Sequence, residues 1–524
     1  MVRGLLKRLH SPGSRSFSTI ILIIGSVISK IFGIIREFSM AAIFGTSLET
    51  DSWLMASIVP NLFYGLLTNT ITNVVIPVLS GHVQVVDNDV AADVYLDEAF
   101  TWTLIIGLGM VALGEVLSSH LIHWVAPGFY GERYRLAVVM VRIMLPAMPF
   151  MALGSLINGI LQSRQIFAPS TVTPIIINVF RLVGIVALGL WIGIIGVAIG
   201  FLLAQMIQLA YLLPTLAAQK VRLRLRFSAS HPWTRQSVRL AAPFLASHGA
   251  NVAGTIVDRI FASTLAIGRI SALNFSNVLS GLPLTLLINP LVAPLYTQLS
   301  QAFNHHNRAQ FQQKLQEGFE LVTVIILPLA FGFALLRVPI IRILYQHGHF
   351  NVQSTAITSH LLVFWAIGLP AQALGTLFSR GLFAQRVTRV TAQMGMVAIA
   401  TNIAGDFFLI HPLGAAGLAL ATSLAAWCRT LGLAAWLFSR GAAPVRARPR
   451  FIAMAGLALA VYVAVLLAGD TLLRLNQHAF GAVLVLGTLF TVSLALALYL
   501  GILQRSGVVP LLTQRHSLRS GGGA

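Results

Sequence analysis

The chain has 524 residues, of which 56% are hydrophobic and 10% are charged, and its mean hydropathy is +0.83. A soluble domain carries about 25% charged residues, so this composition excludes a chain that covers itself with a polar surface. The formal net charge of +20 would favour nucleic-acid binding in a soluble protein. In a membrane protein, by contrast, cytoplasmic loops collect basic residues, so we expect no nucleic-acid partner.

Long apolar runs predict an all-α polytopic membrane protein of about 14 transmembrane helices, since about 20 apolar residues cross the hydrocarbon core. In chain order, the predicted spans are 17–44, 53–80, 99–126, 137–161, 166–189, 191–216, 238–264, 271–299, 317–336, 357–385, 390–411, 413–439, 451–469 and 478–504. Prolines inside several spans, such as Pro77, Pro290 and Pro370, indicate bent or broken helices that line a cavity. The lone Cys428 lies in an apolar run and is expected to be packed.

The distribution of Lys and Arg predicts that both termini are cytoplasmic and that the first span is an uncleaved anchor. Basic residues gather before span one, between spans six and seven, between spans twelve and thirteen, and after span fourteen. Between spans six and seven, VRLRLRF (221–227) alternates basic and apolar residues. This stretch either sets the topology or lies along anionic lipid headgroups.

Span one carries three charged residues in its apolar run, and a carboxylate follows at the start of span two. These residues are Lys30, Arg36, Glu37 and Asp51. Adjacent side chains on a helix diverge, so we expect no simple ion pair between Arg36 and Glu37. A charge at mid-helix costs about 2.5–3.5 kcal/mol on translocon scales. We therefore expect span one to line a hydrated cavity whose cations attract phosphate. The alternative is that Arg36 pairs with Asp51 and only locks two helices together.

A second group of polar residues falls at similar depth in other spans. Span seven contains Asp258, span eleven presents Asn402 and Asp406 on one face at i,i+4, and span twelve contains Thr422. Such an all-oxygen set suits a hard cation, while two neighbouring carboxylates otherwise share a proton. The residues thus predict a bound Na⁺ or a shared proton, unless Asp258 pairs with Arg259 and Asp406 reaches the membrane surface. No motif for an organic cofactor or a hydrolase occurs in a suitable context.

Several phrases, taken in order, resemble the MurJ (MviN) family of lipid II flippases in the MOP exporter superfamily. SKIFGIIREFSMAAIFGTSLETDSWLMASIVPNL resembles the family's first two helices, and the likeness continues through ILQSRQIFAPSTVTPIIIN, DRIFASTLAIGRISALN, ILYQHGHF and PLGAAGLALATSLAAW. It covers about residues 17–440.

The resemblance implies two pseudo-symmetric six-helix lobes followed by two C-terminal helices. The expected parts are a basic N-terminus (1–16), an N-lobe (17–216), a basic linker (217–237), a C-lobe (238–440), a lipid-tail groove (451–504) and a cytoplasmic tail (505–524). Family members move an undecaprenyl-diphosphate-linked peptidoglycan precursor across the bacterial inner membrane by alternating access. The implied function is transport for cell-wall synthesis and cell shape, with the synthesis machinery as a functional partner.

The resemblance also assigns roles to individual residues. The family's cavity cations fall on Lys30 and Arg36, and its acid in span two falls on Asp51. Its sodium site falls on Asp258, Asn402, Asp406 and Thr422, with the backbone carbonyl of Leu418 as a further ligand.

Two positions depart from the family pattern, because Tyr64 and Val278 stand where the family usually has arginine. Arg259 or Arg269 would be a substitute, and the identity of the lipid-linked glycan stays open. The alternatives are a flippase for another polyprenyl-linked glycan, a cation-coupled exporter of the MATE type, a membrane glycosyltransferase and a scaffold that transports nothing. A glycosyltransferase is disfavoured because the longest external connection, 337–356, contains no carboxylate.

Overall fold

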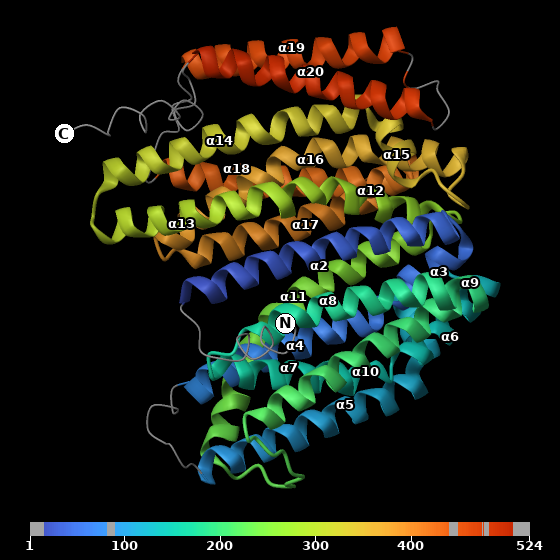
Figure 1. Ribbon diagram of the computed structural model, residues 1–524, viewed down its shortest axis with the longest axis vertical. Coiled ribbons are helices and arrows are strands. Elements are labelled where there is room, and N and C mark those ends of the chain that lie inside the picture. Colours follow the sequence, from blue (N-terminus) through green and yellow to red (C-terminus); the bar gives the residue numbers. More distant parts are fainter. Residues whose placement is uncertain (1–14, 81–89, 440–448, 474, 476–480, 507–524) are drawn as a thin grey trace, which may run out of the picture. The chain divides into compact units, whose positions relative to one another are not determined.

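The computed structural model describes residues 15–80, 90–439, 449–473, 475 and 481–506, without side-chain detail for 15–23, 67, 69, 90–91, 243 and 246–253. All regular elements in these ranges are helices (Figure 1), which confirms the predicted all-α class. The chain forms two compact units, Met1–Ser271 and Ala272–Ala524.

The first unit contains the following elements: α2 (Arg15–Phe44), α3 (Leu48–Ala56), α4 (Ile58–Ser80), α5 (Val90–Val125), α6 (Gly131–Met144), α7 (Ala147–Ser163), α8 (Ala168–Val183), the π-helix η1 (Gly184–Leu188), α9 (Gly189–Ile192), α10 (Ile194–Ala218) and α11 (Pro232–Ser263). Its core lies where α4, α5, α7 and α10 meet. Leu156, Ile160 and Leu212 are fully buried there.

Three spans of the first unit are interrupted rather than straight. A turn at Ser57 separates α3 from α4, and α6 and α7 bend by 42° at a short break. Pro146 lies in this break, where it has no N–H to continue the helical ladder. The π-helix η1 follows α8 directly, and such segments often occur next to functional sites.

The second unit contains α12 (Arg269–Pro283, which begins in the first unit), the π-helix η2 (Leu284–Ile288), α13 (Asn289–Asn304), α14 (Arg308–Leu335), α15 (Arg337–Tyr345), α16 (Val352–Ala384), α17 (Thr388–Leu413), α18 (Ala415–Ser439), α19 (Pro449–Leu473) and α20 (Ala482–Ser506). Its main core joins α13, α14, α16 and α18. A separate cluster attaches α19 and α20 to α14 and α15.

Within the described residues, eleven helices are long and apolar enough to cross a membrane, or twelve when the bent pair α6 and α7 counts as one span. Two further helices, α2 with 30 residues and α11 with 32, have the length to cross. The structure is therefore compatible with fourteen spans, and that number stays a prediction. Each predicted span overlaps one helix or a run of consecutive helices.

Two sequence expectations need comment. Cys428 is exposed, so the expectation of a packed thiol is wrong; on an apolar helix such a face contacts lipid instead of protein. Helix α11, which the resemblance assigns to the C-lobe (238–440), packs against α4 and α5 and belongs to the first compact unit. The six-helix lobe boundaries themselves stay a prediction.

Candidate functional site

A stripe of small residues brings α2 against α8. Gly25, Ser29 and Gly33 recur every four residues and so share one helix face. A Cβ on Gly25 would collide with Thr171, and one on Gly33 would contact Asn178. Small residues at such spacing allow membrane helices to approach closely. Glu37 lies one turn beyond Gly33 and interacts electrostatically with Arg181 on α8.

Arg36 is held by a hydrogen-bond network across the contact between α2 and α8. One guanidinium nitrogen donates to Glu37 Oε1 at 2.6 Å, and another donates to Asn178 Oδ1 at 3.1 Å. The amide of Asn178 donates in turn to the backbone carbonyl and hydroxyl of Ser29, at 3.2 and 3.1 Å. The side chains of Arg36 and Glu37 are 25% and 18% exposed, so both are partly accessible.

This network corrects one expectation from sequence. Adjacent side chains on a helix diverge, so no ion pair between Arg36 and Glu37 was expected, but the two residues form one. The arginine side chain is long enough to reach the carboxylate of its neighbour. The alternative pair of Arg36 with Asp51 is not formed, since Asp51 pairs with Arg133. Lys30 lies half-buried on the same helix.

A second guanidinium, that of Arg181 on α8, completes this group. It interacts electrostatically with Arg36, Glu37 and the Tyr64 side chain. It also lies over the ring of Phe201 on α10, 4.1 Å from the centroid. A close helix crossing sets this position, because a Cβ on Gly184 would lie 2.6 Å from the Cα of Gly200.

The group of Arg36, Arg181 and Glu37 carries more positive than negative charge. Arg36 and Arg181 repel each other, and Glu37 is paired with Arg36. Among the described residues, Arg181 Nε is buried without a hydrogen-bond partner. Two half-buried guanidinium groups that share one carboxylate form a site to which an anion adds favourably. We name this group the arginine cluster.

Asp51 does not belong to the arginine cluster and instead joins three segments of the first unit through buried hydrogen bonds. Its carboxylate is fully buried and accepts from Arg133 at 3.0 Å and from the backbone N–H groups of Gly268 and Ser271 at 2.7 and 2.8 Å. These N–H groups lie at the N-terminus of α12, where a carboxylate is stabilised by the helix dipole. Gly268 has φ +82°, and a Cβ there would lie 2.8 Å from Thr46 O. In this conformation Asp51 joins helices, and its expected contact with substrate stays a prediction.

We expect Asp51→Ala to destabilise the folded protein strongly. The substitution leaves the guanidinium of Arg133 buried without its carboxylate, and breaking a buried pair in this way costs about 3–5 kcal/mol. The thermal unfolding midpoint in detergent measures the loss. Asp51→Ala combined with Arg133→Met should recover part of it, whereas fully additive losses would show that the pair contributes nothing.

Four residues of the expected sodium site lie in the second unit. Asn402 and Asp406 are buried on α17, where the amide of Asn402 donates to Asp406 Oδ2 at 3.2 Å. On α18 the Thr422 hydroxyl donates to the Leu418 carbonyl at 3.0 Å. Helices α17 and α18 pack together, and a Cβ on Gly405 would lie 2.7 Å from Ala421 Cβ. Asp406 and Thr422 directly follow these two contact residues.

Asp258, the fifth expected ligand, lies on α11 in the first unit and interacts electrostatically with Arg259. Within the described residues, no three His, Cys, Asp or Glu side chains gather in a way that suits a metal ion. The donors in the second unit are one carboxylate, one amide, one hydroxyl and one carbonyl. Oxygen donors of this kind fit Na⁺ rather than a transition metal.

Comparison with known proteins decides the family. A family model described as "Lipid II flippase MurJ" matches residues 40–499. The chain belongs to the MurJ family. A protein of Rhizobium meliloti (strain 1021) named "Probable lipid II flippase MurJ" is 28% identical over 455 residues, which cover 83% of this chain and 84% of the relative. A protein of the same name from Rickettsia prowazekii (strain Madrid E) is 26% identical and covers 78% of this chain and 81% of its own.

Solved structures show the same fold. A lipid II flippase MurJ in an inward closed conformation matches with a TM-score of 0.78 at 23% identity, over 94% of this chain and all of the other. An inward-facing multidrug transporter of the MATE family in the MOP superfamily matches with a TM-score of 0.66 at 14% identity, over 82% and 99% of the chains. MurJ proteins are transporters, so the expectation that the chain is no enzyme is confirmed by its family.

Sequence reasoning missed Arg181 as a member of the candidate site. The arginine was visible inside an apolar span, but it had no charged residue nearby in sequence to suggest a partner. The expectation that Arg259 or Arg269 substitutes for the arginines absent at Tyr64 and Val278 stays a prediction. The structure brings another cation, Arg181, close enough to Tyr64 for an electrostatic interaction. The absence of an arginine at position 64 and the proximity of Arg181, which is far away in the sequence, both leave no pattern in the neighbouring residues.

Proposed function

We propose that this protein moves a polyprenyl-diphosphate-linked glycan precursor from the inner to the outer leaflet of the bacterial cytoplasmic membrane. The precursor is lipid II for peptidoglycan synthesis, as the names of its relatives suggest. The observation that carries the proposal is the arginine cluster within the membrane-spanning part of the first unit.

The arginine cluster suits a diphosphate for electrostatic reasons. Charges within a membrane are expensive and are placed in protein cavities or pathways. The guanidinium fork of Arg36 has one nitrogen on Asn178 and one on Glu37, which fixes its plane. A diphosphate entering beside it would neutralise the repulsion between Arg36 and Arg181 and supply oxygen acceptors. The site therefore favours an anionic headgroup over a cationic drug.

A charged headgroup site in a chain of two compact units supports transport by alternating access. Two repeats that rock about such a site expose it to one side and then to the other. The polyprenyl tail would stay in hydrocarbon, and we assign its groove to α19 and α20, whose outer faces expose Leu472, Leu486 and Phe490. A photoactivatable polyprenyl-diphosphate analogue should therefore crosslink to these two helices.

We further propose that a cation drives the cycle and that Na⁺ binds Asn402, Asp406, Leu418 and Thr422, with Asp258 as the remaining ligand. Asp406 supplies the negative charge, and Asn402 orients it through the 3.2 Å hydrogen bond. Bound Na⁺ would neutralise this carboxylate and couple its state to the gradient across the membrane. A proton on Asp406 is the alternative with the same charge.

We expect flipping in proteoliposomes to fall at least about tenfold when K⁺ replaces Na⁺ at fixed membrane potential. Asp406→Asn removes the charge that holds the cation, so it should lower the rate and abolish the difference between Na⁺ and K⁺. Equal wild-type rates in the two salts would contradict Na⁺ coupling. A rate that follows an imposed pH gradient instead would assign the role to a proton.

The glycan is tested by complementation. The chain is expressed in a bacterium depleted of its own lipid II flippase, and growth and outer-leaflet lipid II are measured. Recovery of both would support lipid II as substrate despite Tyr64 and Val278. Failure of a well-inserted, abundant protein would favour another polyprenyl-linked glycan, because the diphosphate site would be the same.

The proposal also includes the orientation of the chain in the membrane and its protein partners. We propose that both ends lie in the cytoplasm, which the basic residues of the linker and termini favour. A C-terminal reporter active only in the cytoplasm tests this orientation. Functional association with the cell-wall synthesis machinery is tested by co-purification of this chain with peptidoglycan synthases from the native membrane.

A further inference from the structure

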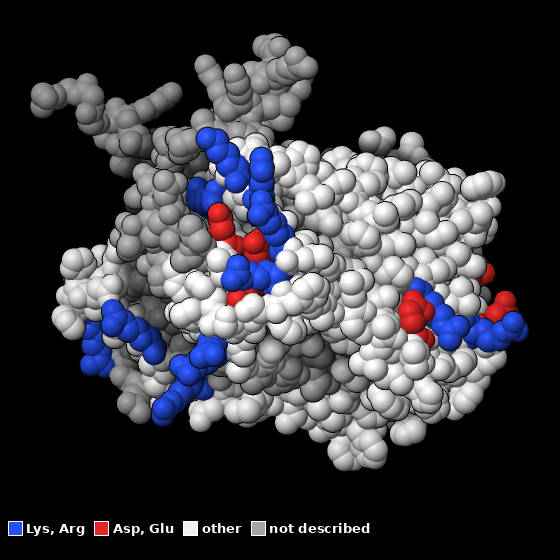
Figure 2. Space-filling view, turned by 90° about the horizontal axis from the view of Figure 1, so that it is seen from below, with Lys and Arg blue, Asp and Glu red and all other residues white. Residues whose placement is uncertain are grey.

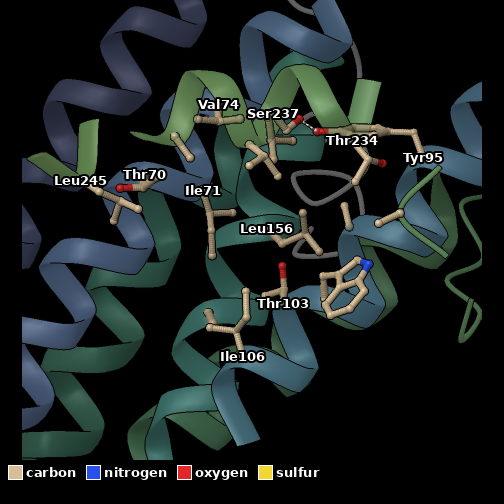
Figure 3. A pocket seen from close by; sticks show the side chains of 17 residues that line it. Thr70, Ile71, Val74, Tyr95, Thr103, Ile106, Leu156, Thr234, Ser237 and Leu245 are labelled. Carbon is tan, nitrogen blue, oxygen red and sulfur yellow. Dashed lines mark hydrogen bonds between the residues drawn. The ribbon is translucent and has the colours of Figure 1, made fainter. Parts of the chain in front are cut away.

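An apolar pocket of about 410 Å³ lies in the first unit, outside the arginine cluster. Its walls come from α4, α5, α7 and α11, and Ile71, Ile106 and Leu156 line it from three of these helices (Figure 3). The volume falls in the range of about 300–1,000 Å³ that is usual for ligand sites. An occupant of this pocket must be predominantly hydrocarbon.

The pocket opens to the surface between α5 and α11. Four of its large apolar lining residues are themselves exposed, Trp102 and Ile106 on α5 and Val238 and Leu245 on α11. Helix α5 is a membrane-span candidate, so this opening faces lipid. A chain that enters it comes from the surrounding leaflet.

The basic linker between α10 and α11 is fixed beside this opening. The backbone N–H of Arg224 donates to Asp97 at 2.7 Å, and that of Arg226 donates to the Thr101 hydroxyl at 2.8 Å. The indole N–H of Trp102 donates to Ser228 O at 2.9 Å. Trp102 thus belongs both to the pocket and to the linker contact, as expected of a residue at a membrane interface.

The linker presents more positive than negative charge next to the pocket. Its exposed arginines, together with those in the first turns of α11, are Arg222, Arg224, Arg226, Arg235 and Arg239. The described carboxylates nearby are Asp93, Asp97 and Glu98, of which Glu98 is buried and accepts from the Thr234 hydroxyl at 2.6 Å. On the face in Figure 2, Lys and Arg likewise gather around a few acids, beside a broad band of uncharged surface.

Two exposed apolar side chains alternate with these arginines. Leu225 and Phe227 are 59% and 77% exposed on the linker. Apolar side chains among basic ones are typical of segments that lie in the headgroup region of an anionic membrane. A loop that only set the topology would need the basic residues but neither these apolar side chains nor a pocket beside them.

We propose that this pocket and the basic linker form a binding site for an anionic phospholipid of the inner leaflet. One acyl chain occupies the pocket between α5 and α11, and the phosphate of the headgroup contacts the guanidinium groups of Arg224 and Arg226. The bound lipid holds the linker against α5. This inference needs only that the first unit spans a membrane, so it stands apart from the proposed transport function.

Tryptophan quenching by brominated lipids tests the site. The full chain is placed in phosphatidylcholine nanodiscs that contain a small, equal fraction of acyl-brominated phosphatidylglycerol or phosphatidylcholine. The signal of Trp102 is the difference between wild type and Trp102→Phe. We expect brominated phosphatidylglycerol to quench this signal at least about threefold more than brominated phosphatidylcholine. Equal quenching by the two lipids would show that the pocket contacts membrane lipid without a preference for the anionic headgroup, and it would overturn the proposal.

Two variants separate the headgroup from the chain. Arg224→Gln with Arg226→Gln should lower quenching by phosphatidylglycerol to the phosphatidylcholine level, whereas Arg389→Gln, an exposed arginine at the start of α17, should not. Ala241→Phe narrows the pocket and should lower quenching by either lipid. Unchanged quenching in the double or the pocket variant overturns the corresponding contact.

A second measurement does not depend on the fluorescence of Trp102. Phosphatidylglycerol should raise the thermal unfolding midpoint of the wild type above its value in phosphatidylcholine, since a ligand of the folded state stabilises it. The double arginine variant should lose this increase. An equal increase in both proteins would show that no specific headgroup contact exists.

Discussion

Arg36→Ala should abolish lipid flipping while leaving a folded, membrane-inserted protein. Arg36 is the most directly held cation of the arginine cluster, with hydrogen bonds to Glu37 and Asn178 that fix the plane of its guanidinium. Alanine removes the positive charge and the remaining N–H donors that a diphosphate would meet, and it leaves Glu37 without its partner. We expect the transport rate to fall at least about a hundredfold, because a lost charged hydrogen bond worth about 1.5–3 kcal/mol accounts for about 10- to 150-fold and repulsion between the unpaired Glu37 and the substrate adds to it.

Two control variants distinguish a role in binding from a role in packing. Asn178→Ala removes the contact that links Arg36 to α8 but keeps the guanidinium, so it should reduce transport much less. Arg36→Lys keeps the charge without the fork and should fall between the two. If Asn178→Ala is as inactive as Arg36→Ala, the arginine serves helix packing and the assigned role is wrong. Thermal midpoints of all three variants check that each is folded.

The sequence predicts the helices of this protein well because each is a long apolar run. The predicted spans 413–439 and 478–504 correspond to α18 (Ala415–Ser439) and α20 (Ala482–Ser506). Interruptions are harder to predict, since the turn at Ser57 and the π-helix η1 carry no proline or charged residue of their own. They arise from packing between helices, which a single apolar pattern does not encode.

Partners distant in sequence could not be assigned from sequence. Asp51 and Arg133 are separated by 82 positions, and each was visible only as a charge near a span end. The pair of Arg36 and Glu37 was mispredicted for the opposite reason, because ideal helix geometry ignores the reach of a long side chain. The i,i+4 spacing of Asn402 and Asp406, by contrast, predicted a contact that the structure contains. Local spacing on a helix is thus informative for short side chains that share a face.

Loss of Arg181 should lower transport at least about tenfold, and a guanidinium at position 64 should restore part of it. Arg181 and Tyr64 interact electrostatically, so an arginine at position 64 would bring positive charge to the same part of the first unit. We therefore expect Arg181→Leu to be poorly active and Arg181→Leu combined with Tyr64→Arg to recover toward wild type. The measurement is flipping of a fluorescent polyprenyl-diphosphate lipid in proteoliposomes.

A matched control separates this effect from the general cost of removing a buried arginine. Arg429 on α18 also has a buried Nε without a hydrogen-bond partner in the described part of the chain, but it belongs to the second unit. Arg429→Leu should lower the thermal midpoint without a charge-dependent loss of transport, and Tyr64→Arg should not rescue it. If Tyr64→Arg fails to rescue Arg181→Leu although both variants are folded, Arg181 supports the packing of α8 on α10 through Phe201. Rescue would instead show that transport needs a cation at this place, whichever helix supplies it.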